Sequence, residues 1–252
     1  MCLVAFAHRP GTRLPWVLAS NRDEFHDRPT APLAWWQDAP LLGGRDLEAG
    51  GSWLALSRGG LLALVTNVRE PQRSAEPVRS RGELVTRWLQ APLFEPEALQ
   101  AWSDEPRHGF NLLGLDLLGG RAVHLGNRPA RAQAVPPGLH GLSNATLGTP
   151  WPKVRTLQQR LADTLAHELP PDTVTERLMR ALADTAPVPD DQLPATGVPL
   201  ERERQLAPAF IRITGGARDY GTRCSTVVIA EALDTQALRI HVTERRHAPD
   251  QC

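Results

Sequence analysis

The sequence is short of cysteine, and this shortage excludes two classes of protein. Its three cysteines, Cys2, Cys224 and Cys252, are an odd number and too few for a disulfide scaffold. A reducing compartment is therefore expected, and a cytoplasmic location with it. The cysteines form no CxxC pair, and their spacing to histidine makes poor zinc half-sites, so no metal site is predicted.

Net charge and long apolar runs are also lacking. The 28 basic and 28 acidic side chains cancel, which excludes a nucleic-acid partner bound through bulk positive charge. Lys153 is the only lysine, and we interpret the arginine excess as a compositional bias. No stretch approaches the roughly 18–20 apolar residues of a membrane helix, so no integral membrane segment is expected. The apolar start of the chain lacks a basic leader and a cleavage site, and it predicts a first strand.

Short apolar runs broken by glycine-rich turns predict many strands. They fall at residues 3–7, 16–19, 52–57, 61–66, 110–115, 122–125, 210–213, 226–230 and 238–242. Capping-box patterns at Ser80 with Glu83 and at Thr173 with Glu176 predict helix starts. Two helices are expected within about 152–185, joined at Pro170-Pro171. The proline-rich stretch from 187 to 208 predicts a long surface loop.

This order of strands, helices and further strands favours an α/β or α+β sheet layered with helices. The strands do not alternate regularly with helices, which speaks against a doubly wound fold. Because strand-like segments resume after the proline-rich loop, we predict a single domain over residues 1–252.

Cys2 is the residue of this sequence that says most about possible catalytic chemistry. If Met1 is removed, Cys2 presents a free α-amine, with a pKa of about 7.7–8.0, beside its own thiol. That amine can take the thiol proton, so the cysteine becomes a nucleophile without a separate histidine. The alternative is a small apolar side chain buried in the first strand.

The polar tetrapeptide Asn21-Arg22-Asp23-Glu24 follows the second predicted strand. Arg22 can stabilise a thiolate, and Asp23 can hold the N-terminal amine by a charge-assisted hydrogen bond. If the first two strands pair, both side chains reach Cys2. The alternative is a solvated, charged turn.

The chain resembles a known family at many collinear motifs, from Met1 to about Ile229. They are Asn21-Arg22-Asp23-Glu24-Phe25, Arg28-Pro29-Thr30, Gly44-Arg45-Asp46, Gly50-Gly51-Ser52-Trp53-Leu54, Thr66-Asn67, Ser80-Arg81-Gly82-Glu83-Leu84, Gly109-Phe110-Asn111-Leu112-Leu113, His140-Gly141-Leu142-Ser143-Asn144-Ala145, Thr149-Pro150-Trp151-Pro152-Lys153-Val154, Leu193-Pro194-x-Thr196-Gly197-Val198-Pro199 and Tyr220-Gly221-Thr222-Arg223-x-Ser225-Thr226-Val227. Together they resemble the NRDE family, also called the transport and Golgi organisation protein 2 family. Cys224 stands where that family's pattern leads us to expect a serine.

The NRDE family is in turn similar to the N-terminal-nucleophile hydrolases of the cysteine type. This likeness implies an α+β fold, a four-layer αββα sandwich, and cleavage of a non-peptide amide or acyl thioester. It implies a catalytic set at Cys2, Arg22, Asp23, Asn67, Asn144 and Arg223, with the two asparagines donating to the oxyanion. Taken alone, Asn144 also fits a turn or helix cap, and Arg223 an exposed strand-edge charge.

A binding site for an apolar or acylated small molecule is predicted from aromatic residues. Its candidates are Trp35, Trp36, Trp53 and Glu24, although core packing explains any single tryptophan as well.

The family resemblance also implies an alternative function, a non-enzymatic carrier of haem or of lipid and acyl-coenzyme A. Haem is then cargo, and no cofactor is required. The eight histidines are its candidate ligands: His8, His26, His108, His124, His140, His167, His241 and His247. The sequence leaves the choice between enzyme and carrier open, and the oligomeric state with it.

Overall fold

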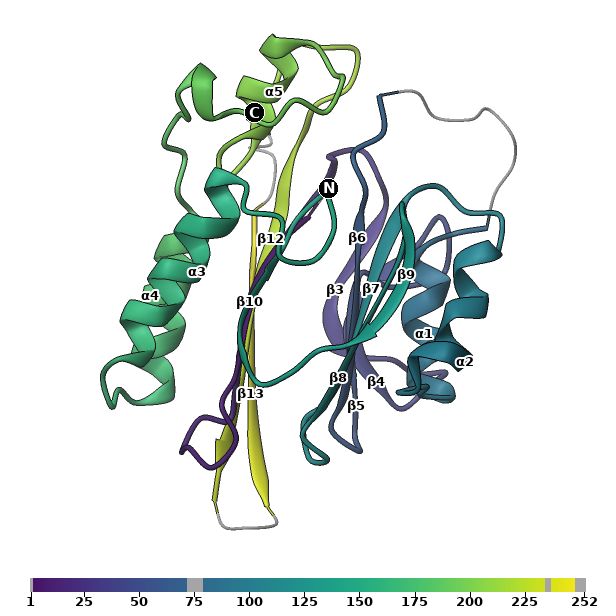
Figure 1. Ribbon diagram of the computed structural model, residues 1–252, viewed down its shortest axis with the longest axis vertical. Coiled ribbons are helices and arrows are strands. Elements are labelled where there is room, and N and C mark those ends of the chain that lie inside the picture. Colours follow the sequence, from purple (N-terminus) through teal and green to yellow (C-terminus); the bar gives the residue numbers. More distant parts are fainter. Residues whose placement is uncertain (1, 72–78, 234–236, 248–252) are drawn as a thin grey trace. The chain divides into compact units, whose positions relative to one another are not determined.

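The computed structural model describes residues 2–71, 79–233 and 237–247. The chain forms two compact units, and each is built from separated stretches. Unit 1 takes 1–27, 138–143 and 148–252, and unit 2 takes 28–137 and 144–147. Each unit is an antiparallel sheet with helices packed on it (Figure 1). The predicted α+β class is confirmed, because each unit contributes one sheet and one helical layer of the kind that an αββα sandwich combines. The single domain over 1–252 stays a prediction.

Unit 1 is organised around the first two strands and a late one. Its sheet runs in the order β10 (Gly138–Leu142), β1 (Cys2–His8), β2 (Trp16–Phe25), β12 (Tyr220–Ala232), β11 (Arg212–Ile213), and β13 (Leu238–Arg246) also pairs with β12. Helices α3 (Pro152–Leu165) and α4 (Pro171–Leu182) pack on this sheet. The pairing of β1 with β2 that the site prediction required is therefore present.

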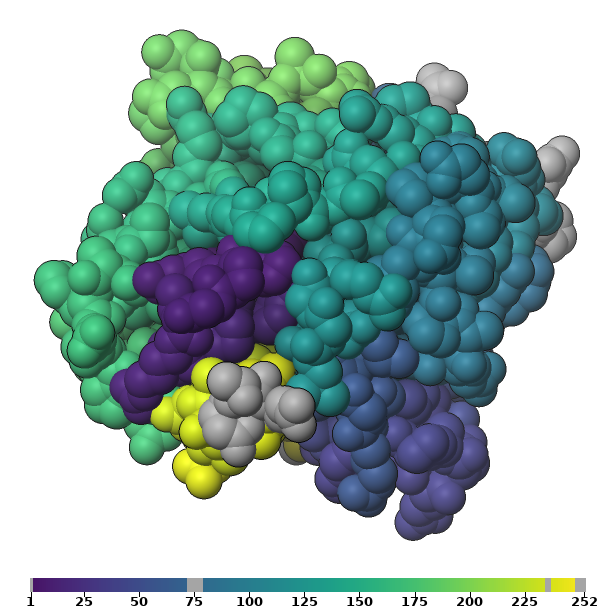
Figure 2. All heavy atoms as spheres, turned by 60° about the horizontal axis from the view of Figure 1, so that its bottom comes forward, coloured from purple at the N-terminus to yellow at the C-terminus, as the bar shows by residue number. Residues whose placement is uncertain are grey.

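The loop between β1 and β2 is tied to the far end of β12. The backbone N–H of Ala232 donates to the carbonyl of Arg13 at 2.8 Å, and the Arg13 guanidinium pairs with Glu231 at 2.7 Å. In Figure 2 this loop is purple and lies beside the yellow end of the β12–β13 hairpin. The N-terminal hairpin is thus held to β12 at its turn as well as along its length.

Unit 2 is a meander of neighbouring strands. Its sheet runs in chain order through β3 (Thr30–Trp35), β4 (Leu41–Asp46), β5 (Leu54–Ser57), β6 (Leu61–Asn67), β7 (Phe110–Asp116), β8 (Arg121–Asn127) and β9 (Ala130–Ala134). Helices α1 (Gly82–Gln90) and α2 (Pro96–Gln100) and the 3₁₀ turn Ala101–Asp104 cover it. Because each strand pairs with its sequence neighbour, the unit is built from local contacts.

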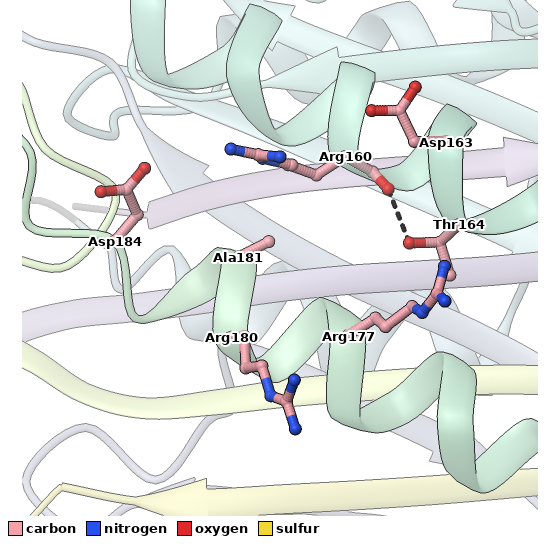
Figure 3. Close-up of a pocket in the computed structure, with 7 residues that line it drawn as sticks. All are labelled: Arg160, Asp163, Thr164, Arg177, Arg180, Ala181 and Asp184. Atoms are coloured by element: carbon pink, nitrogen blue, oxygen red, sulfur yellow. Dashed lines mark hydrogen bonds between the residues drawn. The ribbon is translucent and has the colours of Figure 1, made fainter.

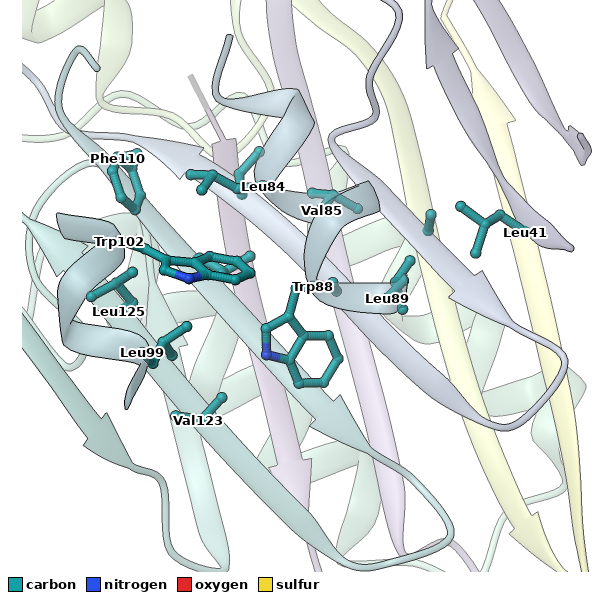
Figure 4. Packing of buried hydrophobic residues seen from close by; sticks show 14 residues of the cluster. Leu41, Leu84, Val85, Trp88, Leu89, Leu99, Trp102, Phe110, Val123 and Leu125 are labelled. Atoms are coloured by element: carbon teal, nitrogen blue, oxygen red, sulfur yellow. The ribbon is translucent and has the colours of Figure 1, made fainter. Parts of the chain in front are cut away.

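The core of unit 2 is centred on Trp88 of α1 (Figure 4). Leu84, Val85, Trp88 and Leu89 recur at helical spacing, so one face of α1 is buried. The indole of Trp88 is fully buried over Gly114, where any side chain would overlap the ring, and its Nε1 donates to the carbonyl of Leu93 at 3.1 Å. The glycine thus makes room for the buried indole of Trp88.

Several sequence predictions about local structure are wrong. Neither capping box forms. Helix α1 begins after Arg81, and there the Ser80 hydroxyl accepts from the Gly82 N–H at 3.2 Å instead of from the N–H of Glu83. Helix α4 begins after Pro170, which makes no side-chain cap bond. Glu83 instead binds Arg79 and Arg107. The stretch 187–208 is not loop throughout, because it contains the 3₁₀ turn Asp190–Gln192 and α5 (Leu200–Leu206). A proline stands just before each of these two elements, where it favours a helical start. Treating the prolines only as helix breakers therefore fails to predict both elements.

The core packing gives the first prediction. Replacing Trp88 by alanine removes a fully buried indole, and we expect the free energy of unfolding to fall by about 3–5 kcal/mol. Urea denaturation followed by circular dichroism measures this change. Trp35→Ala is the matched control, because Trp35 is 44 % exposed. Equal losses in the two variants would contradict the assignment of Trp88 to the core.

Candidate functional site

Strand register brings Cys2 next to Arg22. Cys2 lies directly opposite Arg22 in the β1–β2 pair, and Arg22 lies directly opposite Cys224 in the β2–β12 pair. Directly opposed residues point to the same face of a sheet, with Cβ atoms about 4.5–5.5 Å apart. Arg22 therefore lies between Cys2 and Cys224, and all three residues are buried.

The sulfur of Cys2 lies in a polar environment despite its burial. Burial raises the thiol pKa, and the charge of Asp23 raises it further, whereas the charge of Arg22 and a hydrogen bond from the Asp23 backbone N–H lower it. The expected stabilisation by Arg22 is present, but it does not outweigh burial. The carbonyl of Cys2 accepts a bond from the Ser143 hydroxyl at 2.9 Å, which fixes the backbone at the start of β1. The thiol therefore needs a proton acceptor close by before it can react.

Asp23 is a buried carboxylate, held from one side by a hydroxyl. The Thr222 hydroxyl donates to its Oδ1 at 2.7 Å, and the backbone N–H of Ile211 donates to the same hydroxyl at 2.9 Å. The Thr222 hydroxyl therefore bridges the backbone N–H of Ile211 and the carboxyl group of Asp23. Burial raises the pKa of Asp23, and the charges of Lys153 and Arg22 and the Thr222 bond oppose that rise.

Arg223 is the extra residue of a bulge in β12, where the pairing with β2 shifts register between Thr222 and Cys224. Its guanidinium donates to the carbonyl of Phe25 at 2.8 Å. Burial and the neighbouring charge of Arg22 lower its pKa. Glu24, the predicted ligand contact, accepts a bond from the Phe25 backbone N–H at 2.9 Å. The bulge thus brings a second arginine to the end of β2.

The tetrapeptide Asn21-Arg22-Asp23-Glu24 lies within strand β2, and it does not form the polar turn that the sequence predicts after this strand. β2 continues to Phe25, so its successive side chains point to opposite faces. Asn21 points towards the helices, and its amide donates to the carbonyls of Leu182 and Ala209, both at 2.8 Å. Arg22 points to the other face with Cys2. One segment therefore clamps the helical layer and supplies the candidate site.

Sequence reasoning missed the polar residues behind Asp23 and Asn21. Thr222 and Ser225 belong to the late Tyr220–Val227 motif, and Ser225 donates to Asn21 Oδ1 at 2.6 Å and contacts His247 Nε2 at 2.9 Å. Lys153 is almost fully buried and donates to the carbonyl of Leu206 at 2.9 Å. In the sequence, the feature that points to Lys153 is that it is the only lysine, which the arginine excess explains equally well as a compositional bias.

The two predicted oxyanion donors lie together in unit 2. The side-chain amide of Asn144 donates to the carbonyl of Asn67 at 2.9 Å, and the carbonyl of Asn144 accepts from the Arg69 N–H at 2.8 Å. Asn111 supports this loop, because its amide donates to the carbonyl of Ala145 at 2.9 Å. Asn144 is thus held in a hydrogen-bonded loop, and its role as a donor stays a prediction.

The three candidate tryptophans do not form one wall. The indole of Trp36 packs on the core of unit 2 and donates to the carbonyl of Gly43 at 3.0 Å. Trp53 fills the space beside Gly44, where a side chain would overlap its ring. Gly43 faces the core, so Gly44 and Trp53 lie on the other face of the sheet. Trp35 is exposed on β3 and stacks with Arg58 at 4.1 Å. Their contact with a ligand stays a prediction.

Two other family-like motifs have a structural explanation in unit 2. Gly51 and Gly82 lie so close that a side chain on Gly51 would overlap the backbone of Gly82, and Ser52 N–H donates to the Gly82 carbonyl at 3.2 Å. Arg28 binds Asp46 at 2.8 Å and thereby joins the segment after β2 to the end of β4. These motifs hold the sheet of unit 2 to α1 and fix Arg28 on the end of β4, so they need no chemical role.

A groove of about 460 Å³ lies between α3 and α4 of unit 1 (Figure 3). Arg160, Arg177 and Arg180 line it with Asp163 and Asp184. In Figure 3 the guanidinium of Arg180 points away from that of Arg160, so the three cations do not converge on one point. The groove therefore offers no assembled anion site.

The candidate haem ligands that make side-chain contacts are spread over both units. His8 stacks on Trp16, His140 on Phe6, and His124 contacts Asn111 Oδ1 at 3.0 Å. Among the described residues, no group of three or more His, Cys, Asp or Glu is arranged to hold a metal. One of the poor zinc half-sites pairs His247 with Cys252, and Cys252 lies outside the described residues. In the part of the chain described, no helix has the length and apolarity to cross a membrane.

A sequence profile of the Transport and Golgi organisation 2 family matches residues 1–249. The chain belongs to this family. It is similar to the Transport and Golgi organization protein 2 homolog of Bos taurus (35 % identity) and of Homo sapiens (33 %), each over 92 % of this chain and 89 % of the relative. The Transport and Golgi organization protein 2 of Drosophila melanogaster is 30 % identical over 92 % of this chain and 88 % of its own length.

Two solved structures also match the family member described here. One is a Caenorhabditis elegans ortholog of N-acylethanolamine-hydrolyzing acid amidase, with a TM-score of 0.49 and 11 % identity over 90 % of this chain and 92 % of that one. The other is the C2A mutant of conjugated bile acid hydrolase from Clostridium perfringens, with a TM-score of 0.41 and 8 % identity over 98 % and 97 %. At these scores neither likeness bears on chemistry.

The Asn111 network gives the second prediction, which concerns pH. Burial lowers the pKa of His124 to about 4, whereas an unfolded histidine titrates near 6.5. Between these values the unfolded chain binds a proton that the folded chain does not. Stability is therefore full above about pH 6.5 and should fall by about 3 kcal/mol towards pH 4.

Chemical denaturation of wild type and His124→Gln at a series of pH values measures this loss. The variant should show a shallower decline over the same window. His167→Gln is the control, because His167 is an exposed histidine. A wild-type curve that coincides with that of His124→Gln would contradict the assignment.

Proposed function

We propose that this protein is an N-terminal-cysteine hydrolase that acts on a non-peptide amide or an acyl thioester. The observation that supports it is the register of β1 on β2, which sets Cys2 opposite Arg22 and gives its sulfur the backbone N–H of Asp23. A cation and a hydrogen-bond donor at the sulfur both favour the thiolate. A cysteine that only filled a core would need neither.

Removal of Met1 supplies the proton acceptor that the buried thiol needs. The freed α-amine of Cys2 has a reference pKa of about 7.7–8.0, close to that of the thiol, so it can take the thiol proton at neutral pH. The ammonium that results then lies beside its own thiolate. Asp23 is the buried carboxylate that we propose to bind this ammonium.

The reaction follows from these groups. The thiolate attacks the carbonyl carbon and forms a C–S bond, and the ammonium returns its proton to the departing amine or thiol as the scissile bond breaks. Water then attacks the acyl-enzyme, with the amine taking a proton from it. Expulsion of the thiolate releases a carboxylic acid and restores Cys2. No redox step or metal enters this sequence of bonds.

The proposal also assigns roles to residues of unit 2. The family resemblance supports Asn67 and Asn144 as oxyanion donors, and the bond from the Asn144 amide to the Asn67 carbonyl holds the two residues next to each other. The tryptophans are proposed to contact an apolar or acylated ligand. No contact among the described residues favours the alternative, carriage of haem or acyl chains, so we propose the hydrolase.

The third prediction tests the nucleophile directly. The intact mass of the purified protein should lack Met1, and iodoacetamide should modify Cys2 faster than any other thiol. The Cys2-containing peptide, followed by mass spectrometry over time, gives the rate. Cys2→Ala should abolish this fast phase, and a panel of N-acyl amides and acyl thioesters should acylate only the protein that retains Cys2.

Cys224→Ser is the matched control for this test. Cys224 is buried on the same face, and burial with Glu244 raises its pKa well above the usual value, so its loss should leave the fast phase intact. Retention of Met1 on most molecules, or equal rates at the two thiols, would overturn the proposed function.

A further inference from the structure

Three buried polar residues interrupt an apolar face of the unit 2 sheet. Thr66 on β6 is directly opposite Asn111 on β7, and His124 lies on the next strand, β8. Leu64 and Leu113 are two positions away along the same strands and therefore share this face. Thr66, Asn111 and His124 are at most 3 % exposed. Because a buried polar group costs free energy unless it is hydrogen-bonded, these three residues require a specific arrangement of bonds.

The side-chain amide of Asn111 joins the three residues to the segment Asn144–Leu147, which belongs to the same unit. Its Nδ2 donates to Thr66 Oγ1 at 3.1 Å and to the carbonyl of Ala145 at 2.9 Å. Its Oδ1 lies 3.0 Å from His124 Nε2. A backbone carbonyl can only accept, so the bond to Ala145 identifies the nitrogen end of the amide, and Oδ1 then faces His124.

The protonation state of His124 follows from this orientation. Asn111 Oδ1 can only accept, so the imidazole carries its proton on Nε2 and donates it. In the part of the chain that the structure describes, His124 Nδ1 is buried and has no hydrogen-bond partner, which favours a ring nitrogen without a proton. Burial lowers the pKa of His124 to about 4, so the ring is neutral at neutral pH. The imidazole therefore holds the Asn111 amide in one orientation.

The Asn111 amide in turn holds the segment that carries Asn144, a proposed oxyanion donor. Its acceptor, Ala145, directly follows Asn144 in the chain. The carbonyl of Asn144 accepts from the Arg69 N–H at 2.8 Å, and its amide donates to the carbonyl of Asn67 at 2.9 Å. Those two bonds lead to the end of β6 and the residues after it, whereas Asn111 ties the segment to β7, which is paired on both sides.

We propose, on the basis of the function proposed above, that Asn111 and His124 are positioning residues for the oxyanion donor Asn144. His124 orients the Asn111 amide, and this amide holds the Asn144 segment on the sheet. A donor stabilises an oxyanion only if it is fixed in advance where the charge develops, so a donor outside the sheet needs such support. Leucine at both positions would fill this face without polar groups to satisfy, so packing alone does not explain the pair.

The fourth prediction compares two reactions of Cys2. In acylation by p-nitrophenyl acetate, the thiolate attacks the ester carbonyl, a tetrahedral oxyanion forms, and p-nitrophenolate leaves. In alkylation by iodoacetamide, the thiolate displaces iodide from a saturated carbon, and no oxyanion forms. Loss of an oxyanion donor should therefore slow acylation and leave alkylation unchanged. Release of p-nitrophenolate, less the rate in Cys2→Ala, and the mass of the alkylated peptide measure the two rates.

The variants remove the positioning contacts one at a time. His124→Phe keeps a ring and loses the donor, and Asn111→Leu loses the amide at similar volume. The ratio of acylation to alkylation should fall about tenfold in His124→Phe and about 10²-fold in Asn111→Leu, because complete loss of a donor typically costs about 10²–10³ in rate. His124→Gln retains an N–H donor and should restore most of the wild-type ratio.

Asn127→Leu is the matched control. Asn127 is a buried asparagine of β8, and its side chain binds the backbone of residues 107, 108 and 110. The variant loses a buried amide from the same sheet, so its stability should fall while its ratio of acylation to alkylation stays at the wild-type value. An equal fall of both reactions in His124→Phe, or an unchanged ratio there, would overturn the positioning role and leave the hydrolase proposal standing.

A double variant tests whether the two residues act in series. If His124 acts only through Asn111, His124→Phe should change nothing further in an Asn111→Leu background, and an additional fall in the ratio would overturn the proposal. His124→Phe alone leaves the Asn111 amide in place, so it remains informative where Asn111→Leu does not fold. A wild type that retains Met1, or whose Cys2 is neither acylated nor rapidly alkylated, would overturn the proposed function and this inference with it.

Discussion

The buried carboxylate of Asp23 is the constraint on which the rest of unit 1 depends. A carboxylate out of water must be compensated by hydrogen bonds and opposite charge, or it takes up a proton. The Thr222 hydroxyl on β12 donates to it at 2.7 Å, and the charges of Lys153 and Arg22 oppose the rise in pKa that burial imposes. Because Thr222 and Asp23 lie opposite each other on paired strands, the environment of this carboxyl group depends on the register of β12 on β2.

Strand alternation divides the tetrapeptide between two tasks. Asn21 is fully buried and ties the end of α4 and the Ala209 carbonyl to the sheet, and Asp23 faces the same helical side. Arg22 faces the other side, in line with Cys2 and Cys224. Asn21 therefore packs against the helical layer, whereas Arg22 lies on the face of Cys2. Asp23 shares the helical face with Asn21 and is the residue that we propose to bind the Cys2 amine.

Motifs that look equally family-like in sequence have different physical causes. Gly51 and Gly82 are explained by the close approach of two backbones, and Arg28 by its ion pair with Asp46. Thr222, Ser225 and Lys153 belong to polar contacts behind the candidate site. Only the contacts in the structure distinguish the packing motifs from the motifs next to the candidate site. In a single sequence, a glycine needed for packing and a residue needed for chemistry look alike.

Much of the secondary structure could be predicted because it depends on local pattern. The apolar runs at β1, β6 and β7 and the helical spacing in α1 and α3 are visible without any partner. The polar end of β2, the edge strands β3 and β9 and the short α5 were missed for the opposite reason. Their residues alternate weakly or are half exposed, and pairing with neighbours decides their structure.

The sequence by itself determined the family-like motif set and the candidacy of Cys2, Arg22, Asp23 and Arg223, since residue type and order suffice for both. The tertiary structure decided that Cys2 faces Arg22, that Arg223 lies in a bulge, and that the only lysine lies buried against the carbonyl of Leu206. These facts depend on strand register and on the packing of α3, which join residues that are distant in the sequence. Local pattern carries no information about such pairs, because burial and charge compensation are properties of the folded chain.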